Sequence, residues 1–188
     1  GLDISIDDYG EYFQEEQVPY AMSKRSCLKG RGSFMVGALS RLNLKFDRLA
    51  PATGKIAKEI GFKVPDYNPF HNNLAQALEL HSFLEECIEI IGSLELKKED
   101  VSVKIRPGEA GAITEAPRGL LYHWYRVNRK GVIEKADIVT PTAHSFLNIE
   151  KDLKHLVARI SELPRNEIVL KCEQLVRAYD PCFSCSVH

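Results

Sequence analysis

The longest regular pattern of apolar and polar positions lies between residues 72 and 96. Apolar residues recur there at steps of three and four, which is the spacing of one face of an α-helix. We therefore expect one long helix over residues 72–96, with its apolar face packed into the protein core. The residues on that face are Leu74, Ala77, Leu78, His81, Leu84, Ile88 and Ile91.

A β region is expected over residues 101–142. Val101, Val103 and Ile105 alternate with polar residues, which is the period of a half-buried strand. Further strands are predicted over residues 111–116, 120–127 and 132–140, and residues 128–131 (Asn-Arg-Lys-Gly) are typical of a hairpin loop. Because hairpin loops join antiparallel strands, the predicted sheet is small and mostly antiparallel.

Two further helices are expected over residues 145–179, separated by Pro164. The second ends at Asp180-Pro181, since proline disfavours helical geometry in the residue before it. Residues 1–70 predict irregular structure with short elements, namely a strand near residues 34–36 and short helices over 39–49 and 55–60. The predicted fold class is α+β, with long helices packed around the small sheet in a single unit over residues 1–188.

Composition narrows the class of protein without indicating its chemistry. The 188 residues carry a net charge of −1, with 44% apolar and 27% charged side chains, which is typical of a globular protein. The near-zero charge argues against electrostatic binding of nucleic acid. No apolar run reaches the roughly 20 residues of a membrane span, so we expect no membrane-spanning helix.

The cysteines indicate a reducing compartment. Their number is odd, and the acidic N-terminus has no basic segment before an apolar stretch, so it is not a signal peptide. We therefore expect reduced thiols and a cytoplasmic protein. The absence of an initiator Met indicates processing, a cleaved tag or truncation of a longer chain. The five cysteines are Cys27, Cys87, Cys172, Cys182 and Cys185.

Two cysteines and a histidine lie within the last seven positions, in Asp-Pro-Cys-Phe-Ser-Cys-Ser-Val-His over residues 180–188. Three interpretations compete on chemistry alone. The cysteines are incidental, or Cys182, Cys185 and His188 form part of a structural zinc site with Cys172, or the two thiolates bind a softer metal such as nickel or iron. A dithiol redox motif fits less well, because such motifs normally begin a helix and this one follows a helix.

This ending resembles the C-terminal metal-binding motif of the nickel–iron hydrogenase large (alpha) subunit, Asp-Pro-Cys-x-x-Cys-x-x-His. Three other segments resemble that family in the same order: residues 33–43, residues 115–124 (which begin Glu-Ala-Pro-Arg-Gly) and Thr-Pro-Thr at 140–142. The Cys-Ser-Val-His ending most resembles the cytosolic, NAD(P)-linked branch, which includes archaeal sulfhydrogenases. The resemblance implies reversible cleavage of H2 at a nickel–iron centre.

The resemblance assigns a role to each motif residue. It implies that Cys182 is a terminal nickel ligand and the acceptor of the proton, while Cys185 bridges nickel and an iron that carries carbon monoxide and cyanide. Arg118 is then the second catalytic residue, because its fixed guanidinium donors lie over the open metal position. Pro117 shapes the pocket wall and Thr142 donates its hydroxyl to a cyanide. His188 binds a magnesium ion near the C-terminus.

One departure from the family pattern limits what this chain does alone. The family binds nickel with four cysteines, and the chain has no second Cys-x-x-Cys. It therefore resembles only the C-terminal half of a large subunit, and the N-terminal half belongs to the same or a separate chain. The two alternatives from other classes are a structural zinc-binding module and a metal-free structural descendant of the family.

The implied partners follow from the same resemblance. Too few cysteines remain to bind an iron–sulfur relay, so electrons are expected to pass to the clusters of a partner small subunit, and from there to NAD(P)-linked diaphorase subunits. A maturation endopeptidase removes a C-terminal extension after the motif histidine in the family. The chain ends at His188 and so resembles the processed form.

Overall fold

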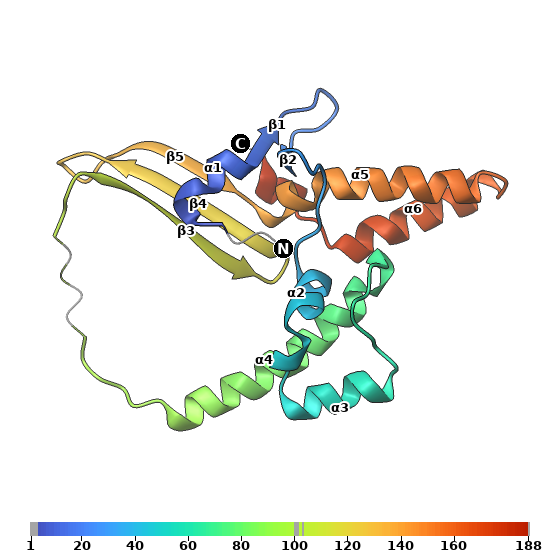
Figure 1. Cartoon of the computed structure of the whole chain (residues 1–188), viewed down its shortest axis with the longest axis horizontal. Helices are drawn as coiled ribbons and strands as arrows, with labels where there is room; N and C mark the ends of the chain where they lie inside the picture. The colour runs from blue at the N-terminus through green and yellow to red at the C-terminus, as the bar shows by residue number, and fades with distance from the viewer. Residues whose placement is uncertain (1–3, 100–101, 103, 188) are drawn as a thin grey trace.

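The computed structural model describes residues 4–99, 102 and 104–187 of the chain. Its larger elements form a three-stranded sheet, a hairpin of two long helices, and a group of three helices below them (Figure 1). The helices are α1 (Tyr9–Tyr12), α2 (Ala38–Lys45), α3 (Pro51–Glu59), α4 (Asn72–Ser93), α5 (Pro141–Ile160) and α6 (Arg165–Tyr179). The strands are β1 (Phe13–Glu16), β2 (Arg25–Leu28), β3 (Gly108–Ala116), β4 (Gly119–Val127) and β5 (Ile133–Val139). Short 3-10 helices are η1 (Ile6–Asp8), η2 (Phe46–Arg48), η3 (Pro69–His71) and η4 (Phe183–Ser186).

The main sheet is an antiparallel meander in the order β3-β4-β5. Ala116 pairs with Gly119, so the turn between β3 and β4 consists of two residues, Pro117 and Arg118. The loop after β4 is closed by Asn128, whose side-chain oxygen accepts hydrogen bonds from the backbone N–H groups of Lys130 and Val132. This hairpin loop, predicted over residues 128–131, is confirmed.

The strand predicted from Val101 to Ile105 is wrong for the residues of that segment that the structure describes. Residues 102 and 104–107 are in no strand, while Val101 and Val103 lie outside the described residues. The strand predicted near residues 34–36 is also absent, because Val36 donates its backbone N–H to the hydroxyl of Ser145 on α5 instead of to a neighbouring strand. The first strand pair is β1 with β2, which the sequence did not predict.

The long predicted helix is α4, but its apolar face is covered along only part of its length. Near the N-terminal end, Ala75 and Leu78 are buried against α2 and α3. Toward the C-terminal end, Leu84, Ile88 and Ile91 are exposed, Ile91 by 75%. Figure 1 shows this end of α4 extending away from α2, α5 and α6, with no helix packed along it. The expectation that the whole face lies in the core is therefore wrong.

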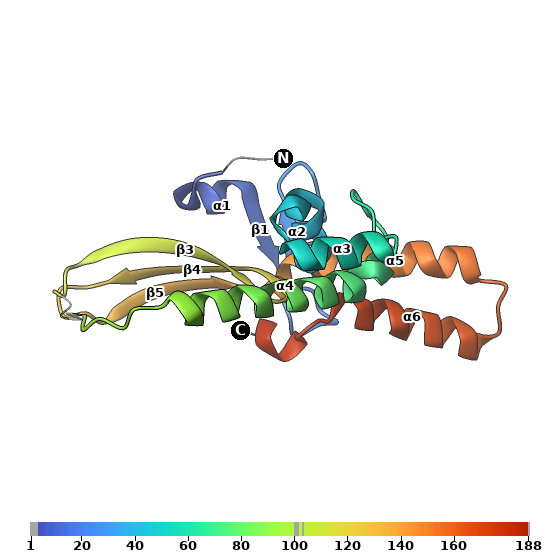
Figure 2. The ribbon, with the colours of Figure 1, turned by 90° about the horizontal axis from the view of Figure 1, so that it is seen from below.

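Helices α5 and α6 form an antiparallel pair (Figure 2), in which α5 contacts β2 and the C-terminal η4. Thr140 begins α5 by accepting a hydrogen bond from the backbone N–H of Ala143, so Thr142 lies in the first turn of this helix and not at the end of a strand. Helix α6 ends where Asp-Pro predicted, and Asp180 adopts a left-handed conformation at φ 50° that turns the chain away.

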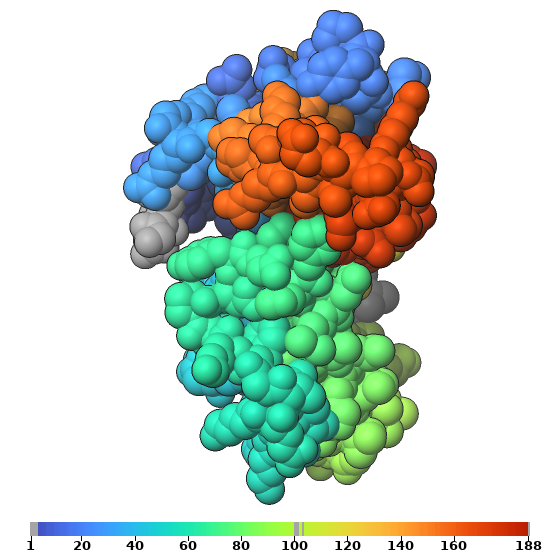
Figure 3. All heavy atoms as spheres, turned by 90° about the vertical axis from the view of Figure 1, so that its right-hand side faces the viewer, coloured from blue at the N-terminus to red at the C-terminus, as the bar shows by residue number. Residues whose placement is uncertain are grey.

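Among the described residues, buried apolar side chains gather in three clusters. One joins α2, α3 and α4, one joins α1 to the sheet and the start of α5, and one joins α5 to α6. Figure 3 shows the α2–α4 segment, coloured cyan to green, as a lobe beneath α5 and α6. In the described part of the chain, every helix is too short or too polar to cross a lipid bilayer.

His144 makes the stability of this fold depend on pH. It is fully buried on α5 among the rings of Tyr9, Phe13 and Phe34, and its Nε2 shares a 2.7 Å hydrogen bond with the hydroxyl of Tyr9. Burial lowers the pKa of His144 from 6.5 to about 4. Between about pH 6.5 and 4, His144 binds a proton in the unfolded chain but stays neutral in the folded one. The free energy of unfolding therefore falls over this range, by about 3 kcal/mol in total.

Urea unfolding at pH 7.5 and pH 5 measures this dependence. We expect the drop in stability between the two pH values to be smaller in a His144→Gln variant than in the unmodified protein. The matched control is His155→Gln, at an exposed histidine on the same helix, which should keep the full drop. An equal drop in the unmodified protein and the His144→Gln variant would contradict the assignment.

Candidate metal centre

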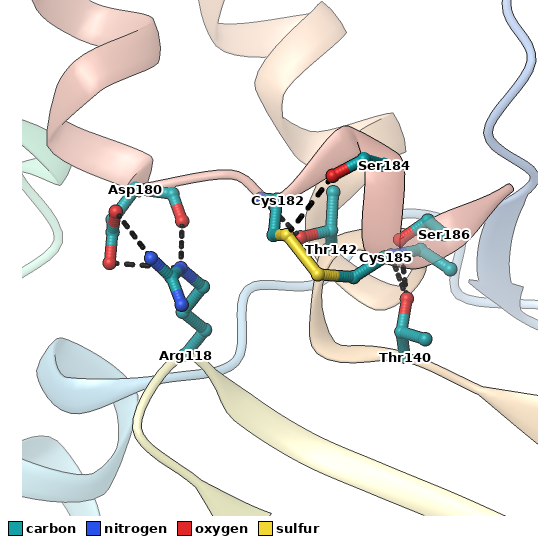
Figure 4. The surroundings of a disulfide bond; sticks show 9 residues. Arg118, Thr140, Thr142, Asp180, Cys182, Ser184, Cys185 and Ser186 are labelled. Atoms are coloured by element: carbon teal, nitrogen blue, oxygen red, sulfur yellow. Dashed lines mark hydrogen bonds and ion pairs between the residues drawn. A yellow bond between two sulfur atoms is a disulfide. The ribbon is translucent and has the colours of Figure 1, made fainter.

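The C-terminal cysteine pair lies in a tight turn directly after α6. The backbone N–H of Cys185 donates to the carbonyl of Cys182, and the two Cα atoms are 5.3 Å apart. The sulfurs form a disulfide in this structure, as Figure 4 shows. The expectation of reduced thiols is wrong for this pair, because the turn brings the two sulfurs within bonding distance. Cys27, Cys87 and Cys172 are free cysteines.

The turn is held from both sides of the motif. The hydroxyl oxygen of Thr142 accepts a hydrogen bond from the backbone N–H of Cys182 at 2.9 Å. On the other side, the buried side chains of Thr140 and Ser186 share a short hydrogen bond. Phe183 contacts the ring of Phe146 on α5 edge to face, with ring centroids 5.5 Å apart. These contacts hold the cysteine turn in a fixed position against the start of α5.

Arg118, from the β3–β4 turn, reaches the same region. Its Nε donates to the backbone carbonyl of Asp180 at 2.8 Å, and its guanidinium forms an ion pair with the Asp180 carboxylate at 3.0 Å. Figure 4 shows Arg118 turned toward Asp180, two residues before Cys182. Arg118, Thr142 and Asp180 all line one small hollow of about 10 Å³. Three segments far apart in sequence thus meet at the cysteine turn.

The two sulfurs fit one part of a metal site and not a complete one. A disulfide cannot bind a metal, because the ligand is the thiolate, so the pair must first be reduced. Two thiolates on one turn are soft donors that suit nickel, iron or zinc. Among the described residues, no group of three or more His, Cys, Asp or Glu side chains is arranged to hold a metal ion. Cys172 therefore does not join the pair, which removes that ligand from the zinc interpretation.

The remaining predicted residues are placed as follows. Pro117 is exposed in the turn before Arg118, and its carbonyl accepts a hydrogen bond from Arg41. His188, the predicted magnesium ligand, lies outside the described residues. Thr142 is buried and contacts the cysteine turn through the backbone of Cys182. Because Thr142 accepts this bond, its hydroxyl proton remains available for donation.

Sequence reasoning missed several residues that build this region. The sequence predicts only a helix end at Asp180, whereas its carboxylate also binds Arg118. Thr140 and Ser186 form the buried hydrogen bond that anchors the tail, and although both lie in segments that resemble the family, the sequence assigned neither a role. Thr140 and Ser186 are 46 positions apart in the chain, and Arg118 and Asp180 are 62 positions apart. Both pairs therefore depend on the folded topology.

Comparison with known proteins places the chain among hydrogenases. The sequence model of the nickel-dependent hydrogenase family matches residues 70–188. The alpha subunit of sulfhydrogenase 1 of Pyrococcus furiosus is 36% identical to the chain, over 100% of the chain and 44% of that relative. The beta subunit of the NAD-reducing hydrogenase HoxS of Cupriavidus necator is 30% identical, over 99% of the chain and 41% of that relative. The chain spans less than half the length of these relatives.

Solved structures share the fold described above. The NAD+-reducing NiFe-hydrogenase in the H2-reduced state superposes with a TM-score of 0.76 at 25% identity, covering 96% of this chain and 42% of that one. The reduced Ni-Fe-Se hydrogenase from D. vulgaris Hildenborough gives a TM-score of 0.69 at 19% identity, which shows similarity of fold alone. The predicted α+β class is confirmed.

Proposed function

The chain belongs to the nickel-dependent hydrogenase family, and we propose that it is the C-terminal half of a nickel–iron hydrogenase large subunit. The proposed activity is the reversible cleavage of H2 into protons and electrons. The observation that supports it most directly is the cysteine turn, where Cys182 and Cys185 lie together beside Thr142, with Arg118 bound to the preceding residues. A structural zinc module would require none of these neighbours.

The chain's own residues supply the base and the polar surroundings of the reaction. In their thiolate form, Cys182 and Cys185 would hold the nickel–iron centre, whose metals would supply the electrophile that polarises H2 when the centre is bound. The sulfur of Cys182 then accepts the proton. Arg118, bound to Asp180 two residues before Cys182, would supply guanidinium N–H donors to the centre, and Thr142 would offer a hydroxyl donor at the same turn.

The finer parts of the cofactor proposal come from the family resemblance. We assign carbon monoxide and cyanide as ligands of the iron, with Arg118, Pro117 and Thr142 forming the surroundings of these small ligands. We also assign a magnesium ion to His188, which extends the motif by three residues beyond Cys185. Side chains that surround a metal site in this way orient its ligands and tune its reactivity.

The other ligands must come from a part of the protein that this chain does not contain. The chain spans 44% of the length of the Pyrococcus furiosus relative, and its described residues offer two metal-binding thiolates on one turn. We propose that the N-terminal half of the large subunit provides the remaining two. The exposed apolar residues at the end of α4 form a surface that such a large partner would cover.

The proposed physiological context is a cytoplasmic, multi-subunit enzyme. A 30% identical relative is named a subunit of an NAD-reducing hydrogenase, and two relatives from Pyrococcus furiosus are named as sulfhydrogenase alpha subunits. We propose that electrons leave through an iron–sulfur small subunit toward NAD(P)-linked diaphorase subunits. NAD(P) is an intracellular coenzyme, which supports the cytoplasmic assignment, and a maturation endopeptidase is the remaining proposed partner.

The test is an infrared spectrum of the native complex that contains this chain, combined with its metal content. Metal-bound carbon monoxide and cyanide absorb in a window in which protein is silent. We expect bands in this window, about one nickel per complex and H2-dependent reduction of an electron acceptor. The control is the same complex prepared from cells grown without nickel, which should lose the bands and the activity together.

Two other outcomes would contradict the proposal. A complex that contains zinc but neither nickel nor infrared bands would support the structural zinc module. A complex free of metal at this turn would identify the chain as a metal-free descendant that keeps the fold alone. In both cases the family relationship would stand and the enzymatic activity would not.

A further inference from the structure

Arg41, on α2, makes contacts that set it apart from the other arginines of the described chain. It lies in the segment over residues 33–43 that resembles the hydrogenase family, yet the proposed function gives it no task. Its side chain is only 18% exposed. A guanidinium has five N–H donors, and in Arg41 all of them donate hydrogen bonds.

Two of the donors fix Arg41 to α4. Its Nε and one terminal nitrogen bind the two carboxylate oxygens of Glu79 at 2.8 and 2.6 Å, which is the bidentate geometry of a strong ion pair. The Glu79 side chain is 9% exposed, so solvent screens the pair little. The guanidinium is thereby locked in one orientation.

The other three donors hold the end of β3 and the turn that follows it. Arg41 donates to the Glu115 carboxylate at 2.8 Å, to the backbone carbonyl of Ala116 at 3.0 Å and to that of Pro117 at 2.9 Å. These three residues directly precede Arg118. Because two of the bonds go to backbone carbonyls, Arg41 fixes the path of the chain and not merely a side chain.

The start of α2 closes on the same turn from its other end. Gly37, with φ 107°, lies so close to Arg118 that a Cβ atom there would sit 2.9 Å from the Arg118 carbonyl oxygen. Arg118 in turn binds the backbone carbonyl of Asp180, two residues before Cys182. A continuous series of contacts thus runs from Arg41 through the turn to the cysteine pair.

We propose that Arg41 is a positioning residue that fixes the Pro117–Arg118 turn, and hence the Arg118 guanidinium, against the cysteine turn. This inference rests on the proposed function for its catalytic consequence. Lysine cannot replace Arg41, because an ammonium group has three donors on one nitrogen and cannot bind two carboxylates and two backbone carbonyls at once. Misplacement of a group near a reacting centre by about 1 Å can cost about 100-fold in rate.

The test uses the native complex with Arg41→Lys and Arg41→Gln variants. The first readout is amide hydrogen exchange of a peptide covering residues 115–119, which we expect to become at least 10-fold faster in both variants. The second readout is kcat per bound nickel, which we expect to fall by about 100-fold in Arg41→Gln while nickel content stays near that of the unmodified complex. The control is Arg177→Gln, at an exposed arginine on α6, which should change neither readout.

A double substitution decides whether Arg41 acts through Arg118. If it does, the double variant Arg41→Gln/Arg118→Lys should have a kcat per nickel no lower than Arg118→Lys alone. The guanidinium that Arg41 positions is already absent from Arg118→Lys. Additive losses, or unchanged exchange of residues 115–119, would overturn the proposal. The Arg41→Lys variant keeps the charge and the aliphatic stem, so it provides the exchange measurement should Arg41→Gln fail to fold.

These outcomes are separate from those of the proposed function. An unmodified complex without H2 turnover would refute the hydrogenase activity, whereas the exchange measurement would still decide whether Arg41 holds the turn. An active complex in which both Arg41 variants keep full kcat per nickel would refute the positioning role alone.

Discussion

Replacing Cys182 by serine is expected to abolish H2 turnover in the native complex, to below 1% of the unmodified rate on the order-of-magnitude cost of losing a reacting group. Serine removes a soft thiolate that is proposed both to bind nickel and to accept the proton. Its hydroxyl stays protonated at neutral pH and is a poor ligand for nickel. Nickel content and the infrared bands of the complex should fall together with the activity.

The protein should still fold, which separates this effect from a loss of structure. The bond between the Cys182 backbone N–H and Thr142 does not involve the replaced side chain. The matched control is Cys87→Ser, at a free and exposed cysteine on α4, which should keep full turnover. Unchanged H2 turnover in Cys182→Ser would remove Cys182 from the nickel site and with it the proposed proton acceptor.

Replacing Gly119 by alanine is expected to lower the free energy of unfolding by about 3 kcal/mol or more. Gly119 has φ 128°, a backbone conformation that residues with a side chain rarely adopt. A Cβ atom there would also sit 2.8 Å from the backbone nitrogen of Gly37 and even closer to the side chain of Val36. Because Gly119 follows Arg118 directly, the displaced turn should reduce H2 turnover as well.

Denaturant unfolding of the unmodified and variant proteins measures the first effect, and turnover per bound nickel measures the second. The matched control is Gly54→Ala on α3, where a Cβ would meet no atom within 4 Å and the backbone is helical. That substitution should leave the protein unchanged or stabilise it by up to about 1 kcal/mol. A Gly119→Ala protein as stable as Gly54→Ala would show that the two segments do not pack as described.

Local patterns in the sequence predicted most of the secondary structure. The three- and four-residue spacing predicted α4, and the Asn-Arg-Lys-Gly loop predicted the hairpin between β4 and β5. Asp-Pro predicted the end of α6, since proline restricts the residue before it whatever the rest of the chain does. These features depend on interactions between residues a few positions apart, which covalent geometry already brings together.

Burial could not be predicted in the same way. The apolar spacing along α4 is regular from Leu74 to Ile91, yet Leu78 is 3% exposed and Ile91 75% exposed. Periodicity reports which side of a helix is apolar, whereas burial depends on what lies opposite that side. In this chain α2 and α3 cover the first part of α4. We propose that the N-terminal half of the large subunit covers the rest.

The candidate site also has a part that local sequence predicts and a part that depends on long-range contacts. The cysteine pair and the family could be recognised from the chain's own pattern, because Asp-Pro-Cys-x-x-Cys is local and specific. Three contacts became visible only in the folded chain: Thr142 holds Cys182 across 40 positions, Arg118 binds Asp180 across 62, and Arg41 binds Glu115 across 74. Such bonds form between groups that no local preference brings together, so they exist only after the folding of the intervening chain has offset the entropy of closing those loops.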